Sequence, residues 1–183
     1  MKKKLYTILI MLMVTMLAVT PVFARGAIKL SGSFGTGSIH FDGYATGVGG
    51  YKDGITLEII GIGIPEVTCT NQGGNEAPGQ NPAKVTVDGE QYISPDQIDA
   101  TTKKGKTPVS VSADESVLVI TGTQGGCPND NWTATITSIT WTGAVINVYD
   151  GLDTSGTLLQ TFEFVCDPAL QSGTSLSCVQ VSP

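Results

Sequence analysis

The first residues that could do chemistry together are a serine, a histidine and an aspartate. Ser38, His40 and Asp42 alternate with Ile39 and Phe41, which places the three polar side chains on one face of a predicted strand. Neighbours on one strand face lie roughly 7 Å apart, beyond the hydrogen-bond reach that a catalytic triad needs. Ser38 also lacks the G-x-S-x-G turn that presents a nucleophile. We therefore assign no catalytic role to this group.

Pairs of carboxylates could support hydrolysis of a glycoside, which needs two carboxyl groups roughly 5–10 Å apart across a cleft. The sequence offers three such pairs, and nothing selects one of them: Asp96/Asp99, Asp114/Glu115 and Asp150/Asp153. Calcium binding is an alternative for the last pair, although no EF-hand loop pattern is present. Solvated turns account for all three pairs, so we predict a protein without catalytic residues, metal ligands or cofactors.

The first 24 residues have the pattern of a secretory signal peptide. Three lysines precede an apolar stretch from Leu5 to Val19, and Val22-Phe23-Ala24 then has small side chains at its first and third positions, before a cleavage point. An uncleaved anchor is the alternative, but threonines and a proline interrupt the stretch. We expect cleavage after Ala24, a secreted protein without a further membrane span, and one domain over residues 25–183.

Charge and cysteine content restrict the partners and the compartment. Residues 25–183 keep seven basic and sixteen acidic side chains, a formal net charge of −9, because Lys2, Lys3 and Lys4 lie in the leader. A chain without clustered cations is not suited to bind nucleic acid. An even number of cysteines in an exported chain predicts disulfides, and the spacings contain no metal-type C-x-x-C pair. Three pairings are possible; we expect Cys69–Cys127 and Cys166–Cys178.

The elements that must position these residues are strands. Apolar residues recur with a period of two along most of the chain, and no segment after the leader has the period of a helix, apart from one turn begun at Ser94-Pro95-Asp96. We predict an all-β fold, a single sandwich of two mainly antiparallel sheets, immunoglobulin-like or related, with about eight to ten strands and two disulfide staples.

Three stretches carry more specific strand predictions. Along 132–149 the apolar face shifts near Ser138 and near Thr142-Gly143, which predicts turns or bulges there. Along 55–64 it shifts between Ile59 and Ile60, which predicts a strand that bends between the two sheets. The unbroken apolar run 117–120 predicts a strand covered on both faces.

Two loops, 71–82 and 122–131, are polar and long for connections without structure. The sequence C-T-N-x-G-G-N-x-x-P-G-Q-N at 69–81 is followed by C-P-N-x-x-W-T-A-T-I at 127–136. This combination resembles a recurring type of small secreted bacterial protein of unknown function, over about residues 55–166. The resemblance implies a β-rich exported domain and the 69–127 bridge, and it implies no activity.

The function that we predict is non-catalytic binding of an extracellular ligand, such as a polysaccharide or a cell-surface component. The bridge 69–127 would bring the two polar loops together, although turn chemistry alone also explains their composition. Carbohydrate binding through an exposed tryptophan, hydrolysis by a carboxylate pair, and polymerisation by strand exchange are the alternatives. An aromatic platform of Trp132, Trp141 and Tyr149 would serve the first of these, but the same side chains could fill the core. The candidate interaction surface comprises Asn71, Asn75, Gln80, Asn129, Asn131, Trp132 and Trp141.

Overall fold

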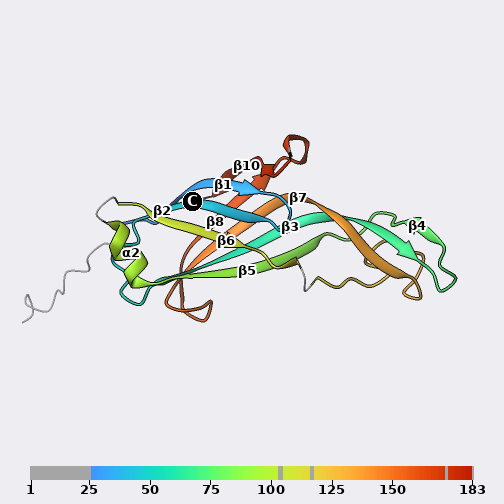
Figure 1. Cartoon of the computed structure of the whole chain (residues 1–183), viewed down its shortest axis with the longest axis horizontal. Helices are drawn as coiled ribbons and strands as arrows, with labels where there is room; N and C mark the ends of the chain where they lie inside the picture. The colour runs from blue at the N-terminus through green and yellow to red at the C-terminus, as the bar shows by residue number, and fades with distance from the viewer. Residues whose placement is uncertain (1–25, 103–104, 116–117, 172, 183) are drawn as a thin grey trace, which may run out of the picture.

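Two antiparallel sheets form the body of the molecule in the computed structural model, which describes residues 26–102, 105–115, 118–171 and 173–182 (Figure 1). The expected signal peptide, 1–24, lies outside these residues. Sheet A has the order β6 (Thr107–Ser112), β2 (His40–Thr46), β1 (Lys29–Gly35) and β9 (Ser175–Leu176). Sheet B has the order β10 (Cys178–Ser182), β8 (Thr157–Cys166), β7 (Thr133–Asp150), β3 (Ile55–Thr70) and β4 (Glu76–Pro78), and β5 (Val85–Ile93) also pairs with β3. The predicted all-β fold with two antiparallel sheets is confirmed.

The main core lies between the sheets, where alternate residues of each strand point inward. The ring of Phe34 on β1 packs edge-on against Phe164 on β8, with ring centroids 4.8 Å apart, and so joins the two sheets. Leu57, Ile59 and Ile146 of sheet B are fully buried in the same core. Each fully buried side chain of this size contributes roughly 1.5–3 kcal/mol to folding.

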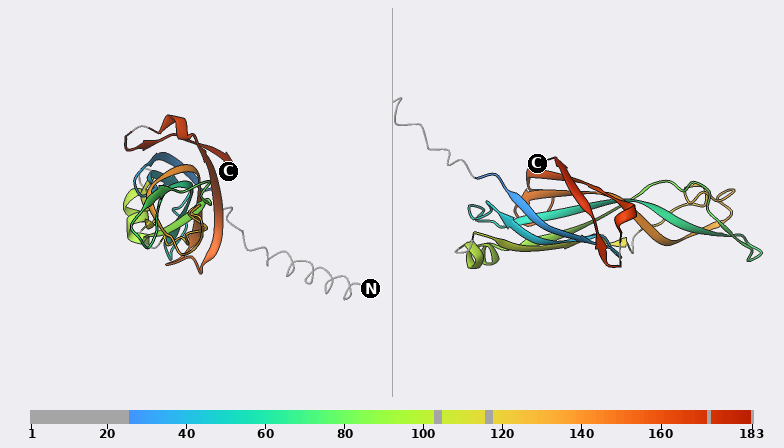
Figure 2. Two further views of the ribbon diagram at one scale, coloured as in Figure 1. Left: turned by 90° about the vertical axis from the view of Figure 1, so that its right-hand side faces the viewer. Right: turned by 90° about the horizontal axis from the view of Figure 1, so that it is seen from above.

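Strands β3 and β7 are much longer than the others and extend beyond the sandwich. They pair from Ile55↔Asp150 to Thr70↔Thr133. Their far ends, 66–70 and 133–138, project together with β4 away from the end where α2 lies (Figure 1), and the view from above shows the same projection (Figure 2). We call this projection, with the loops 71–82 and 118–132 that cover it, the arm.

Two bulges in β7 explain why its apolar face shifts. Thr137 and Thr142 have no partner on β3. Glu66 pairs with Ser138 and the next residue, Val67, pairs with Ile136, so Thr137 is skipped. In the same way, Ile62 pairs with Gly143 and Gly63 with Trp141, so Thr142 is skipped. Each bulge threonine donates its hydroxyl to a carbonyl of β3, Thr137 to Glu66 and Thr142 to Ile62, both at 3.2 Å. The predicted interruptions are therefore confirmed as bulges within one strand.

The shift predicted within 55–64 is wrong. The odd-numbered residues of β3 face inward along its whole length, and Ile60, Ile62 and Ile64 lie on the outward face. The inward positions between Ile59 and Val67 include Gly61 and Gly63. A side chain there would collide with a methyl group of Ile39 or Ile139, respectively, and would also crowd the indole of Trp141. The glycines make room for these side chains, so the inward face continues without an apolar side chain to mark it.

The strand predicted at 117–120 is also wrong over its described part, 118–120. Leu118 packs on the sandwich core and Ile120 on the arm, but Val119 between them is 88% exposed and none of the three belongs to a strand. The apolar residues therefore mark a segment that crosses from the sandwich to the arm.

Helices are short. α2 (Pro95–Thr102) is longer than the predicted single turn, and a reciprocal cap between Ser94 and Gln97 fixes its start. The Ser94 amide donates to Gln97 Oε1 at 2.9 Å, and the Gln97 amide donates to Ser94 Oγ at 3.3 Å. A 3₁₀ turn, η2 (Pro168–Leu170), follows β8. Among the described residues, no helix is long and apolar enough to span a bilayer.

Candidate functional site

Both predicted disulfides are present. Cys69, at the end of β3, is bonded to Cys127 in the loop that precedes β7, and Cys166 on β8 is bonded to its cross-strand neighbour Cys178 on β10. The first bond closes a 58-residue separation and the second one of 12 residues. In the chain-entropy account they stabilise the folded state by about 4 and about 3 kcal/mol, respectively.

The Cys69–Cys127 bond fixes the two polar loops to each other at the end of the arm. We define the arm tip as residues 71–82 and 121–132. The Gln80 amide donates to the Gly126 carbonyl at 2.9 Å, and the Ala83 amide donates to the Gln124 carbonyl at 2.8 Å. Gly126 has φ +74°, and a side chain there would collide with the Gln80 backbone. A glycine is therefore required where the loops meet.

A small apolar cluster separate from the main core supports the arm tip. Val67, Cys69 and Cys127 are buried in it, and the partly buried Ile120, Trp132, Ala134 and Ile136 pack against them. Trp132 is therefore half-buried, with its ring supporting the loops.

The asparagines and glutamine of the predicted surface divide into two roles. Asn71 Oδ1 accepts hydrogen bonds from the amides of Gly73 and Asn75, both at 2.9 Å, and Asn129 Oδ1 accepts one from the Asn131 amide at 3.0 Å. Asn71 and Asn129 thus stabilise turns, as expected if turn chemistry explains the composition of these loops. The carboxamides of Gln80 and Asn131 are exposed, and neither forms a hydrogen bond within the described part of the chain.

A carboxylate also orders the arm tip. Asp130 Oδ1 accepts a hydrogen bond from the Thr123 amide at 2.6 Å. This bond, with a further one from the Thr123 hydroxyl, holds the pKa of Asp130 below its ordinary value. The loop 121–131 is therefore ordered by its own side chains as well as by the disulfide.

The inclusion of Trp141 in the interaction surface is wrong. Its indole is 1% exposed and lies in the main core. Tyr149 is on the outward face of sheet B, where its hydroxyl donates to Glu58 Oε2 at 3.1 Å. Partial burial is the main reason why the pKa of Tyr149 is raised, and the neighbouring Glu58 carboxylate raises it further. Trp132, Trp141 and Tyr149 therefore lie in three different surroundings and form no common platform.

His40 and Asp42 are neighbours, but Ser38 contributes its backbone. His40 Nε2 lies 3.7 Å from Asp42 Oδ2, and His40 Nδ1 lies 3.0 Å from the Ser38 carbonyl oxygen. The hydroxyl of Ser38 is thus not the partner of the imidazole, and these three residues do not form a nucleophile–base pair.

The carboxylates of the predicted pairs that the structure describes have different surroundings, and the side chain of Asp99 lies outside the described part of the chain. Asp153 Oδ1 accepts hydrogen bonds from the Ser155 amide at 2.8 Å and the Ser155 hydroxyl at 2.5 Å, which lowers the pKa of Asp153. Glu115 has one buried oxygen without a hydrogen-bond partner in the described chain, and burial raises its pKa. Asp96 lies in the first turn of α2. No group of three His, Cys, Asp or Glu side chains within 26–102, 105–115, 118–171 and 173–182 is arranged to hold a metal ion.

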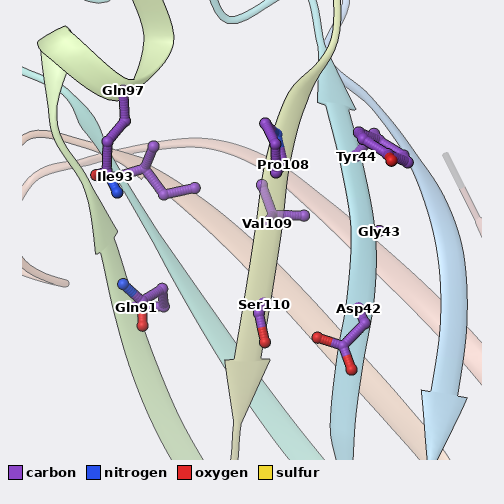
Figure 3. Close-up of a pocket in the computed structure, with 9 residues that line it drawn as sticks. All are labelled: Asp42, Gly43, Tyr44, Gln91, Ile93, Gln97, Pro108, Val109 and Ser110. Atoms are coloured by element: carbon purple, nitrogen blue, oxygen red, sulfur yellow. The ribbon is translucent and has the colours of Figure 1, made fainter. Parts of the chain in front are cut away.

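A second surface feature lies outside the predicted set. A shallow groove of about 600 Å³, which we call the sheet A groove, crosses the outward face of sheet A toward β5 and α2 (Figure 3). Its principal side chains are Asp42, Tyr44, Gln91, Gln97, Pro108 and Ser110. The sequence does not reveal it because residues 42–44 are far in the chain from the other lining residues at 91–97 and 108–110. The alternation with Phe41 does place Asp42 and Tyr44 on an outward face.

Comparison of the chain with known protein families, with curated proteins and with solved structures finds no match. The resemblance to small secreted bacterial proteins therefore stays a prediction.

Proposed function

We propose that the chain is an exported, non-catalytic binding protein whose recognition surface is the arm tip. The leader-like first 24 residues and the two disulfides support an oxidising, extracellular setting. The acidic composition supports a ligand that is not a nucleic acid.

The main support for the proposal is that the loops at the arm tip are bonded to each other. A disulfide and two backbone hydrogen bonds between the loops fix a polar surface outside the main core. Loops held rigidly by a scaffold are where binding residues concentrate, because ordering them beforehand lowers the entropic cost of association. Gln80 and Asn131 present amide donors and acceptors on this surface.

The test is a binding assay with labelled protein, residues 25–183, on immobilised panels of bacterial polysaccharides, plant polysaccharides and purified extracellular-matrix proteins. We expect at least one ligand to bind, and the double variant Gln80→Ala/Asn131→Ala to weaken that binding about tenfold. The matched control is Gln180→Ala, an exposed glutamine on β10 of the sandwich, which should leave binding unchanged.

Two outcomes would contradict the proposal. Equal binding by the wild-type protein and the double variant would show that the arm tip is not the recognition surface. Release of reducing sugar from a bound polysaccharide would favour the hydrolase alternative instead, and the carboxylates would then be tested one by one.

A further inference from the structure

The sheet A groove has a shape and lining that differ from those of the arm tip. It is built by β2, β6, β5 and α2, at the end of the molecule opposite to β4 (Figures 1 and 3). Asp42 on β2 is paired directly with Ser110 on β6, and Tyr44 is paired with Pro108. Cross-strand partners share one face of a sheet, so these four side chains form adjacent polar and apolar halves of one floor.

Tyr44 supplies the apolar half. Its side chain is 47% exposed, and Pro108 is its cross-strand partner. The ammonium of Lys106 lies over one face of the Tyr44 ring, 5.8 Å from its centre, so a ligand would stack on the other face. An exposed aromatic ring with a flat apolar neighbour is suited to stack against the C–H face of a sugar ring.

Carboxylate, hydroxyl and carboxamide groups supply the polar half. The Asp42 carboxylate is turned toward Ser110 in Figure 3, and Gln91 and Gln97 face the groove from β5 and α2. Two hydrogen bonds hold these glutamines in place: Gln91 Nε2 donates to the Tyr92 carbonyl, and Gln97 Oε1 accepts from the Ser94 amide, both at 2.9 Å. Groups fixed in this way bind hydroxyls with a small entropic cost.

The charges near the groove indicate the class of ligand. Asp42 contributes one negative charge and Lys106 one positive charge close to Tyr44, so neither anions nor cations are strongly favoured. A ligand with many hydroxyl groups, no net charge and flat apolar faces fits both halves of the floor. We propose that the sheet A groove is a binding site for a neutral oligosaccharide, independent of the arm tip and centred on Tyr44.

The test is an NMR titration of ¹⁵N-labelled protein, residues 25–183, with neutral hexasaccharides of glucose, xylose and mannose, each taken separately to millimolar concentration. We expect one of them to shift the amide signals of Asp42, Tyr44, Gln91 and Ser110 and to leave those of the arm tip in place. The absence of shifts with every hexasaccharide, or shifts confined to the arm tip, would overturn the proposal.

Variants separate stacking from other contributions. Tyr44→Ala should raise the dissociation constant about tenfold, and Tyr44→Phe should keep it within about twofold, because the ring and not the hydroxyl makes the contact. Tyr149→Phe is the control on the opposite sheet and should change nothing. Unchanged affinity in Tyr44→Ala would overturn the proposal. Gln80→Ala/Asn131→Ala should leave this titration unaffected. The proposal for the sheet A groove and the proposal for the arm tip can therefore be refuted independently of each other.

Discussion

The sandwich and the arm share strands β3 and β7 but are stabilised by different means. In the sandwich, alternate residues of both strands are buried against sheet A, including Leu57, Ile59 and Ile146. In the arm no second sheet covers the same strands, and the buried residues of its described cluster are Val67, Cys69 and Cys127. A cluster of this size buries too little apolar surface to fix two long loops, so the disulfide and the hydrogen bonds between the loops must supply the rest. The arm is thus an extension that costs conformational entropy and adds little to the main core.

The largest effect should come from the sandwich core. Phe162→Ala removes a ring that is 2% exposed and should lower the free energy of unfolding by about 3–5 kcal/mol, since the cavity cannot be filled by solvent. Denaturant unfolding followed by near-ultraviolet circular dichroism measures this. A smaller loss of unfolding free energy for Phe162→Ala than for removal of the arm disulfide would contradict the view that the sandwich core is the main source of stability.

The second effect concerns the arm disulfide. Cys69→Ser/Cys127→Ser should lower the free energy of unfolding by up to about 4 kcal/mol in the chain-entropy account. The structural loss should be confined to the arm, with the main core intact. The measurement is the same unfolding experiment together with NMR spectra of the folded variant. Loss of dispersed signals from β1 and β2 would contradict the separation of the two regions.

The sandwich and the arm also differ in how much of their structure can be predicted from the sequence. The strand alternation, the presence of two disulfides and the bulges of β7 are predictable, because the side-chain period and the even cysteine count can be read directly from the sequence. The inward face of β3 is not, because Gly61 and Gly63 fill positions that are explained only by the packing of Ile39, Ile139 and Trp141 against them.

In the arm, the segment 118–120 has the composition of a buried strand. It pairs with no other strand, and it crosses from the sandwich, where Leu118 packs, to the arm, where Ile120 packs. The sheet A groove could not be anticipated either, because Tyr44, Gln91 and Ser110 are brought together only by the pairing of β2 with β6 and the position of β5.

A smaller effect is expected from Gly126→Ala. The positive φ of Gly126 and its close approach to the Gln80 backbone make any side chain unfavourable, at a cost of about 1–3 kcal/mol. The variant should displace the loops at the arm tip and weaken ligand binding there, while the melting of the sandwich changes little. Gly37→Ala is a matched control, because Gly37 also has a positive φ but has open space around it. Equal effects of both variants on the arm tip would contradict the account.

The smallest effect is a dependence on pH. The pKa of Asp130 is lower in the folded arm than its ordinary value of 3.8, so the stabilisation is present above that value and is lost as the pH falls through the folded pKa. The amide signal of Thr123 should therefore move in acid, and Asp130→Asn should abolish the movement. The Ser155 amide, which is bonded to Asp153, is the reference on the sandwich and should titrate in both proteins.

Amide hydrogen exchange shows whether the disulfide holds the arm tip as a rigid surface. The amides of Gln80 and Ala83 donate to the opposite loop, so both should exchange slowly in the oxidised protein and rapidly in Cys69→Ser/Cys127→Ser. The amide of Ile59, in the sandwich part of β3, should stay protected in both proteins. Rapid exchange at Gln80 and Ala83 in the oxidised protein would show that the loops are not held together and would contradict the account.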